Sequence, residues 1–183
     1  MTTVLIPLAQ GCEELEAVTI IDLLRRANIK VITASLDDQT VTASRGVRLV
    51  ADTDIDTALQ QDYDMVVLPG GLPGADHLDN DPRIRNLLKK MADSNRYTAA
   101  ICAAPKVLAN AGLLDGKQAT GYPGFLEKTN NDSIHIKTDP VVTDGRIITS
   151  RGPGTAMDFA LTLIEILAGN DKRTEVETAL VRT

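Results

Sequence analysis

The sequence YTAAICAAPKVL, residues 97–108, joins an apolar segment to a segment of helical character at one cysteine, Cys102. Residues 97–101 are apolar or β-compatible and lack helical spacing, which predicts a short buried strand. Residues 103–110 are compatible with a helix, and Pro105 is tolerated in its first turn. Cys102 is therefore expected where a strand ends and a helix begins, a position whose free N–H groups and dipole favour a thiolate. The alternative is a buried structural cysteine, a common role for a free thiol.

Segments of strand and helix character alternate along the rest of the chain. Strands are predicted at 3–9, 29–35, 41–44, 46–50, 64–68, 97–101, 119–120 and 141–150, the last with a tight turn at 144–145. Helices are predicted at 13–28, 55–60, 82–94, 103–110, 155–168 and 172–181. This alternation predicts an α/β fold with a mostly parallel sheet covered on both faces. Since ligands bind beyond the carboxyl ends of such strands, the loops at 10–13, 69–71, 102–103 and 151–154 are expected to meet at one site.

Composition limits the class of protein. The 183 residues are 43% hydrophobic and 24% charged, as in an ordinary globular protein, and they suit one domain spanning 1–183. The net charge of −6 argues against nucleic acid or an anionic membrane as the main partner. We see no signal peptide and no apolar run of the ~20 residues that a membrane helix needs. Two cysteines without an export signal suggest free thiols in a reducing compartment, so a cytoplasmic location is expected.

A glutamate heads the apolar stripe of the first predicted helix. The stripe repeats at helical spacing and consists of Glu16, Ile20, Leu23, Leu24 and Ala27. A buried glutamate near a thiolate should keep its proton, because burial and like charge both raise its pKa. It would then donate a hydrogen bond to the sulfur and act as a general acid or base. Favourable interaction with the helix dipole is the alternative, and it is sufficient for Glu13 and Glu14.

Two further features of the loops bear on the site. Gly70 and Gly71 follow a strand and let backbone N–H groups point at Cys102. Together with the Ala103 N–H, these groups would hold an oxyanion beside the sulfur. The alternative is that the glycines only form a turn, as most glycine pairs do. Cys12 follows the first strand and is either a second oxidisable or resolving thiol, or a small residue that fills a loop.

Other kinds of site lack their sequence signals. Neither His77 nor His135 follows the cysteine directly, and both are expected to be ordinary surface residues rather than partners in a Cys–His dyad. The sequence has no phosphate-binding loop, no dinucleotide-binding fingerprint and no Cys/His cluster with zinc spacing. We therefore expect neither a metal nor a cofactor.

Four motifs together give the chain a family resemblance over its full length. They are GCEELEAV at 11–18, VLPGG at 67–71, AAICAAP at 99–105 and TSRGPGT at 149–155. In combination they resemble the ThiJ/PfpI superfamily and, within it, bacterial members of the DJ-one branch, whose animal members include a parkinsonism-associated protein. The resemblance implies a flavodoxin-like three-layer sandwich that forms homodimers.

The resemblance also implies roles for individual residues. Cys102 matches the oxidisable nucleophile of the family and Glu16 its protonated partner, while Gly70, Gly71 and Ala103 match backbone donors around the sulfur. Residues expected to line the site or its dimer edge are Arg45, Tyr122, Arg151, Glu13 and Cys12. Tyr122 stands where animal members have histidine, which argues against a histidine-assisted step. Ala103 stands where the protease-like branch has histidine, which argues against a cysteine peptidase.

Several activities are implied for this branch. They are glutathione-independent glyoxalase activity, removal of early glyoxal and methylglyoxal adducts from proteins and nucleotides, holdase chaperoning and peroxide sensing under oxidative stress; a thiamine-biosynthesis role is also attributed to bacterial members. For the enzyme, the Cys102 thiolate would attack an aldehyde, Glu16 would shuttle protons, and water would release a 2-hydroxy acid. The alternative is a non-catalytic redox sensor or chaperone in which Cys102 oxidises to a sulfinic acid held by Glu16.

Overall fold

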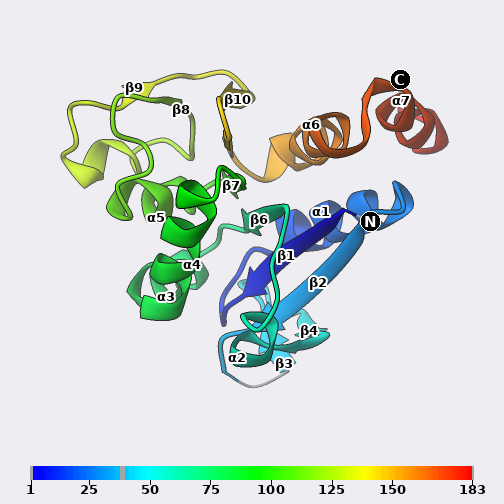
Figure 1. The fold of residues 1–183 in the computed structure, drawn as a ribbon, viewed down its shortest axis with the longest axis horizontal. Helices are drawn as coiled ribbons and strands as arrows, with labels where there is room; N and C mark the ends of the chain where they lie inside the picture. The colour runs from blue at the N-terminus through cyan, green and yellow to red at the C-terminus, as the bar shows by residue number, and fades with distance from the viewer. Residues whose placement is uncertain (1, 38–39, 183) are drawn as a thin grey trace.

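The computed structural model describes residues 2–37 and 40–182, and its centre is a seven-stranded sheet (Figure 1). Its spatial order is β10 (Val141–Asp144), β11 (Ile147–Ser150), β7 (Tyr97–Ile101), β6 (Met65–Leu68), β1 (Thr3–Leu8), β2 (Lys30–Ser35) and β5 (Thr53–Asp54). All neighbouring strands are parallel except β10 and β11. The inner order β2-β1-β6-β7-β11 is the 2-1-3-4-5 order of flavodoxin-like proteins.

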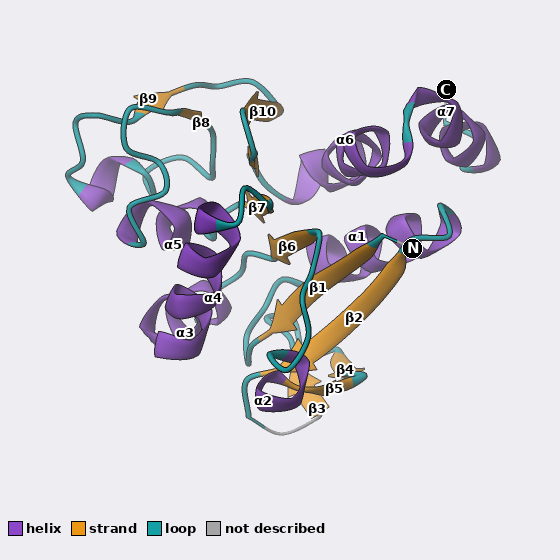
Figure 2. Cartoon of the chain, in the orientation of Figure 1, coloured by secondary structure: helices purple, strands orange, loops and turns teal. Residues whose placement is uncertain are grey.

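Helices cover both faces of the sheet, as Figure 2 shows by secondary structure. One face carries α1 (Glu14–Arg26), α6 (Ala156–Ala168) and α7 (Asn170–Ala179). The other carries α2 (Ile55–Ala58), α3 (Gly74–Asn80), α4 (Pro82–Asp93) and α5 (Pro105–Asn110). The predicted α/β fold, a three-layer sandwich with a mostly parallel sheet, is confirmed.

Two hydrophobic cores lie on the two faces of the sheet, and alternation along the strands separates them. In β1, Val4, Ile6 and Leu8 face the core of α1 and α6, while Leu5 faces the core of α2 to α5. Successive side chains of a strand point to opposite faces, so a strand buried on both faces is apolar throughout. This is why the central strands are continuous apolar runs in the sequence.

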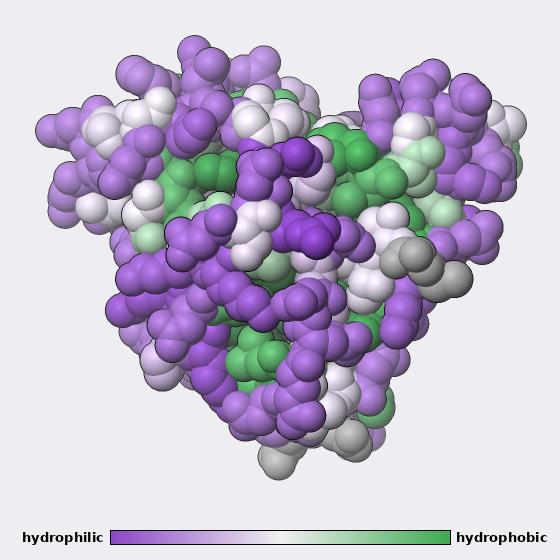
Figure 3. All heavy atoms as spheres, viewed as in Figure 1, coloured by the Kyte–Doolittle hydropathy of each residue, from purple (hydrophilic) through white to green (hydrophobic). Residues whose placement is uncertain are grey.

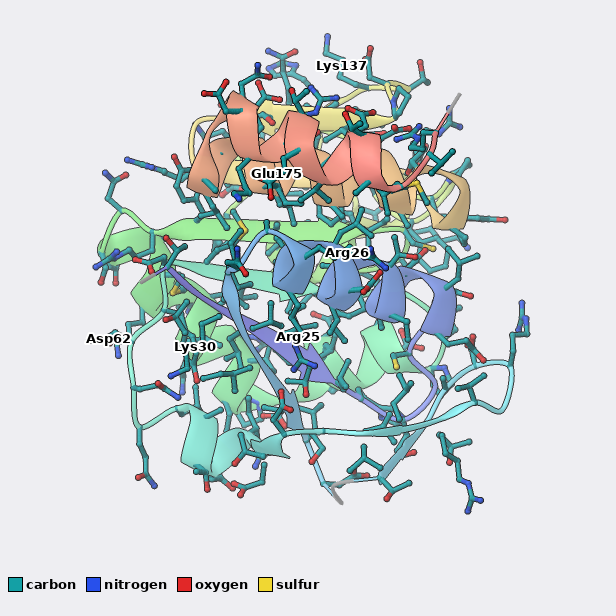
Figure 4. All side chains as sticks on the ribbon, turned by 90° about the vertical axis from the view of Figure 1, so that its right-hand side faces the viewer. Arg25, Arg26, Lys30, Asp62, Lys137 and Glu175 are labelled. Atoms are coloured by element: carbon teal, nitrogen blue, oxygen red, sulfur yellow. The ribbon has the colours of Figure 1, made fainter. Side chains whose placement is uncertain are left out.

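The charged side of α1 faces outward, opposite the apolar stripe that follows Glu16. Arg25 points from α1 towards β2 and pairs with Asp52 at 2.8 Å, while Arg26 pairs with Asp22 one turn earlier at 2.8 Å (Figure 4). On the face seen in Figure 3, hydrophilic residues predominate and hydrophobic residues gather near α6. Among the described residues, none of the helices is long and apolar enough to span a bilayer.

Short elements account for most differences from the sequence prediction. The strands predicted at 41–44 and 46–50 are present as β3 (Thr40–Thr42) and β4 (Arg48–Val50), which form an antiparallel hairpin around Arg45. The short strand predicted at 119–120 corresponds to β8 (Gln118–Ala119). Helix α3, strand β5 and the partner of β8, β9 (His135–Ile136), were not predicted, because so few residues carry no periodic pattern. Single 3₁₀ turns occur at η1 (Glu127–Thr129) and η2 (Pro153–Thr155).

Candidate active site

The loops that follow the parallel strands meet at one edge of the sheet, as predicted. The Glu13 N–H donates to the Gly70 carbonyl at 2.9 Å, which joins the loop after β1 to the loop after β6. The Cys102 N–H donates to the Ser150 carbonyl at 3.0 Å, which joins the end of β7 to the end of β11. The chemistry-bearing residues of four separate loops are thereby brought to the same place.

Cys102 has a backbone conformation that non-glycine residues rarely adopt. Its φ is +64°, in the left-handed region, where an L-residue pays roughly 1–2 kcal/mol. Two hydrogen bonds hold it there, since its N–H donates to Ser150 and its carbonyl accepts from the Tyr122 N–H at 2.8 Å. The residue lies at the edge of the hydrophobic core, and 7% of its surface is exposed. Strain of this kind is characteristic of functional sites.

The helix after Cys102 begins later than the sequence predicts. It starts at Pro105 instead of 103 and has only six residues. Cys102 and Ala103 therefore lie in the turn before it, and the direct influence of the helix on the thiol is small. The groups that do donate to the thiol are the backbone N–H groups of Gly71 and Ala103, which are two of the three donors expected from the sequence.

Gly70 allows the cysteine and the glutamate to approach each other. A Cβ at this position would lie 2.6 Å from the Cys102 Cβ and 2.8 Å from Glu16 Oε2, closer than van der Waals contact permits. Gly71 has φ of +89°, and a Cβ there would lie 2.4 Å from the Glu13 nitrogen. Close approach of backbone, and not turn formation alone, therefore requires both glycines.

Glu16 is completely buried and lies against Cys102. Its Oε2 accepts a hydrogen bond from the Gly70 N–H at 2.9 Å, whereas Oε1 is buried without a hydrogen-bond partner among the described residues. The pKa of Glu16 is raised from 4.5 to about 7. Burial is the main cause and the charge of Glu13 adds to it, while hydrogen bonds with the Gly70 N–H and with Cys102 act in the opposite direction. This agrees with the expectation that burial raises the pKa of this carboxyl group.

The pKa of the Cys102 thiol is also raised, which corrects the expectation of a thiolate stabilised by the helix. Its pKa is raised to about 12. Burial is the largest cause, followed by the charge of Glu16 and a hydrogen bond with it, whereas hydrogen bonds from the N–H groups of Gly71 and Ala103 lower the pKa. Desolvation outweighs those two donors because the charge would lie in a dry site. The two groups therefore titrate as a pair, which loses its first proton near pH 7 and carries a single negative charge above it. The pair holds one proton in the neutral and mildly alkaline range.

Tyr122 and Arg151 line one surface cavity next to the Cys102 turn. The cavity has a volume of about 550 Å³, and Pro140, Gly152 and Thr155 also contribute to its walls. Tyr122 is half exposed and is attached to Cys102 through its backbone N–H, while Arg151 Nη1 donates to the Thr138 carbonyl at 3.0 Å. The structure thus brings these two predicted residues together.

Arg45 lies farther from the pair, in the exposed hairpin. Its N–H donates to both carboxylate oxygens of Glu14, at 2.8 and 3.1 Å, and its guanidinium contacts the Ser44 carbonyl. Within residues 2–37 and 40–182, Arg45 makes no hydrogen bond or ion pair with Cys102 or Glu16. Glu14 is a positioning residue that the sequence did not single out, since its carboxylate anchors this hairpin to α1.

Of the remaining candidates, Cys12 lies in the core and the two histidines lie at the surface. Cys12 is buried, and burial with the charges of Glu14, Glu13 and Glu16 raises its pKa to about 12. Both cysteines are free thiols. His77 and His135 are exposed, as expected. Among the described residues, no group of His, Cys, Asp and Glu side chains is suited to hold a metal ion.

Together, the fold and the site define a class of flavodoxin-like proteins in which a strained cysteine contacts a buried carboxyl group across a glycine. The chain belongs to the DJ-1/PfpI family, whose sequence profile matches residues 2–166.

Relatives in several organisms are similar over nearly the whole chain. Protein DJ-1 homolog A of Arabidopsis thaliana is 47% identical over 181 residues, which cover 98% of this chain and 46% of that protein. The chain thus spans a little under half the length of this plant relative. The glutathione-independent glyoxalase DJR-1.2 of Caenorhabditis elegans is 34% identical over 163 residues, covering 89% of this chain and 87% of that protein.

Solved structures agree with the fold. The crystal structure of Drosophila melanogaster DJ-1beta has a TM-score of 0.95 and 42% identity, and covers 100% of this chain and 98% of that one. The structure of oxidised Toxoplasma gondii DJ-1 has a TM-score of 0.94 and 38% identity, with all of both chains covered. The predicted family and fold are therefore confirmed.

Proposed function

We propose that this chain is a cysteine-dependent, glutathione-independent glyoxalase and deglycase that acts on methylglyoxal, glyoxal and their early adducts. One observation carries the proposal: Cys102 contacts a fully buried Glu16 whose pKa is about 7, so that a nucleophile and a proton shuttle lie together at neutral pH. The C. elegans relative that is named a glutathione-independent glyoxalase supports the same class of reaction.

The first step uses the single negative charge of the pair. Above pH 7 the charge lies on Glu16, and its carboxylate takes the proton of the Cys102 thiol as Sγ forms a bond to the aldehyde carbon of methylglyoxal. Glu16 gives its proton to the aldehyde oxygen, and the product is a hemithioacetal. The N–H groups of Gly71 and Ala103 point at this region and stabilise the negative charge that develops on oxygen.

The second step is an internal redox reaction that needs no external oxidant. The Glu16 carboxylate removes the hydrogen of the sulfur-bearing carbon as a proton and returns it to the neighbouring carbon, while the hydroxyl proton moves to the former ketone oxygen. The first carbon is oxidised, the second is reduced, and a thioester of lactate results. Water then hydrolyses the thioester, which releases lactate and restores the thiol.

The cavity lined by Tyr122 and Arg151 supports a role on larger adducts. It is open to solvent, and Tyr122 in its wall is linked to Cys102 by a backbone hydrogen bond, so we assign it to the part of a protein or nucleotide substrate that lies beyond the aldehyde adduct. The guanidinium of Arg151 is partly exposed there and suits a carboxylate or phosphate of such a substrate.

The test is lactate production from methylglyoxal by the purified chain without glutathione. Cys102→Ser should abolish it, and Glu16→Gln, which keeps the carbonyl acceptor for Gly70, should lower kcat by roughly 10²–10⁴-fold. Asp22→Asn on the outer face of α1 is the matched control and should retain wild-type kcat. If the wild-type protein forms no lactate from methylglyoxal, the proposed glyoxalase activity is refuted.

A redox sensor is the second candidate, because Cys102 is slightly exposed whereas Cys12 is not. The relative from Toxoplasma gondii whose structure is of an oxidised form supports it. Peroxide would convert the Cys102 thiolate to a sulfenic and then a sulfinic acid, with peroxide reduced to water at each step. Intact mass after mild peroxide should rise in wild type and Cys12→Ser but not in Cys102→Ser; an equal rise in all three contradicts it.

We also propose that the chain forms a homodimer. Large apolar side chains are exposed along α1 and on the hairpin beside it, namely Leu15, Val18, Val47 and Val50. Such neighbouring apolar residues are typical of interaction surfaces. Light scattering coupled to gel filtration measures the mass, and a monomer at micromolar concentration contradicts the proposal.

A further inference from the structure

Glu13 occupies the junction between the two loops that build the site. Its carboxylate oxygen Oε2 accepts a hydrogen bond from the Glu16 N–H at 2.8 Å, which makes Glu13 the N-cap of α1. Its own N–H donates to the Gly70 carbonyl at 2.9 Å, and the Gly70 N–H in turn donates to Glu16 Oε2. One residue therefore connects the backbone of Glu16 with the backbone group that binds its side chain.

The cap places a negative charge beside a buried acid. Most helix caps of this kind are Ser, Thr, Asp or Asn, and a serine or threonine would satisfy the same N–H without a charge. Glu13 is half-buried at the mouth of the site, so its charge is only partly screened by water. A carboxylate in this place makes a second negative charge on Glu16 less favourable, and Glu13 is among the causes that raise the pKa of Glu16.

Glu13 is the carboxylate whose charge acts on Glu16. The titratable groups that interact with Glu16 are Glu13 and Cys12 from the loop before α1 and Cys102 from the turn after β7. The Glu14 carboxylate is turned to the hairpin, where it accepts from the N–H of Arg45.

The other elements packed on α1 present apolar residues. Helix α6 packs through Ala156, Phe159, Ala160 and Leu163, and β1 through Val4, Ile6 and Leu8. The α6 carboxylates Asp158 and Glu165 are bound in ion pairs with Arg182 and Arg173. The charge that faces Glu16 from its surroundings is therefore that of Glu13.

We propose that Glu13 is a positioning residue whose capping carboxylate fixes the start of α1 against Gly70 and whose charge favours the protonated form of Glu16. The inference deepens the proposed function, because the protonated acid is the form that delivers the proton to the aldehyde oxygen. Glu13 touches neither the substrate nor the reacting atoms, and it acts through Glu16.

The experiment measures the Cys102–Glu16 pair without requiring turnover. The rate of Cys102 alkylation by iodoacetamide is followed from pH 5 to 9 by mass spectrometry of the Cys102 peptide, which separates it from Cys12. In the wild type the rate rises as the pair loses its first proton. Glu13→Gln keeps a carbonyl oxygen for the cap but removes the charge, and it should shift this rise to lower pH by roughly half a unit.

Three controls separate charge from structure. Glu13→Asp, which restores a charged cap, should return the profile towards that of the wild type. Asp22→Asn removes one charge from the exposed side of α1, where Asp22 pairs with Arg26, and should leave the profile unchanged. Glu13→Ser, a neutral cap, should shift the profile as Glu13→Gln does, because the charge and not the hydrogen bond sets the proton affinity.

The inference is overturned if Glu16→Gln changes the alkylation profile but folded Glu13→Gln leaves it unchanged. An equal shift in Asp22→Asn also overturns it, since a nonspecific charge effect would then be sufficient. The proposed function fails separately, if the wild type makes no lactate while the alkylation profiles shift as expected. Where lactate is formed, the acidic limb of its kcat/KM profile should move with the alkylation profile.

Discussion

Stability should fall as pH rises through neutrality, and Glu16 is the group responsible. In the unfolded chain Glu16 has its ordinary pKa of 4.5, whereas burial raises the pKa to about 7 in the folded protein. Between these values the folded state holds a proton that the unfolded state has released. Stability is therefore fully present below about pH 4.5, and it is lost progressively as pH rises through 7.

The magnitude follows from the two pKa values. They differ by about 2.5, and each unit corresponds to about 1.4 kcal/mol, so the free energy of unfolding should drop by about 3 kcal/mol between pH 4.5 and pH 8. Glu16 is fully buried, so solvent does not screen this effect appreciably. Carboxyl groups with a lowered pKa change the stability below this pH range. The two thiols, whose ordinary pKa of 9.0 is raised, change it above this range.

Urea unfolding at pH 5, 6, 7 and 8 measures the effect in the wild type and in Glu16→Gln. Glutamine retains the acceptor for the Gly70 N–H and cannot ionise, so the variant lacks this contribution. The difference between the two unfolding free energies should change by about 2.5 kcal/mol from pH 5 to pH 8, with the wild type losing stability relative to the variant at high pH. A difference that is constant with pH refutes the reasoning.

Two other substitutions test the packing around the site. Gly70→Ala should lower the free energy of unfolding in urea by about 1–3 kcal/mol, because the new methyl group overlaps Cys102 and Glu16. Gly154→Ala, whose methyl group meets no atom within 4 Å, should change it by less than about 0.5 kcal/mol. Equal losses of stability in the two variants contradict this prediction. Lys106→Met should cost about 1 kcal/mol by breaking the ion pair that joins α5 to Asp76 on α3, and Lys106→Arg should cost less. A methionine variant as stable as wild type in low-salt urea titrations contradicts the second prediction.

Much of the fold was predictable because its signals are local. Apolar runs such as 65–68 and 97–101 mark strands buried on both faces, and the i, i+4, i+7 spacing after Glu16 marks a helix with one buried side. Because the strands run parallel, their carboxyl ends and the loops that follow them lie at one edge of the sheet. The meeting of Glu16, Gly70 and Cys102 follows from this rule once the strands are identified.

Short elements and side-chain bonds between distant segments were not predictable in the same way. Helix α3 has only Ala75 and Leu78 as buried apolar side chains, too few for a periodic pattern. The role of Glu14 depends on N–H groups 31 and 33 residues away, and no spacing along the chain reveals such a partner.

The sequence by itself determined the α/β architecture and the identity of the cysteine and glutamate, since hydrophobic periodicity and residue type are local properties. Only the tertiary structure decided how the Cys102 thiol ionises. The sequence predicted that the start of a helix would favour the Cys102 thiolate, but the folded chain buries the sulfur beside Glu16 and raises the pKa of both groups. The reason is that desolvation and the interaction of two charges depend on which atoms surround them in space.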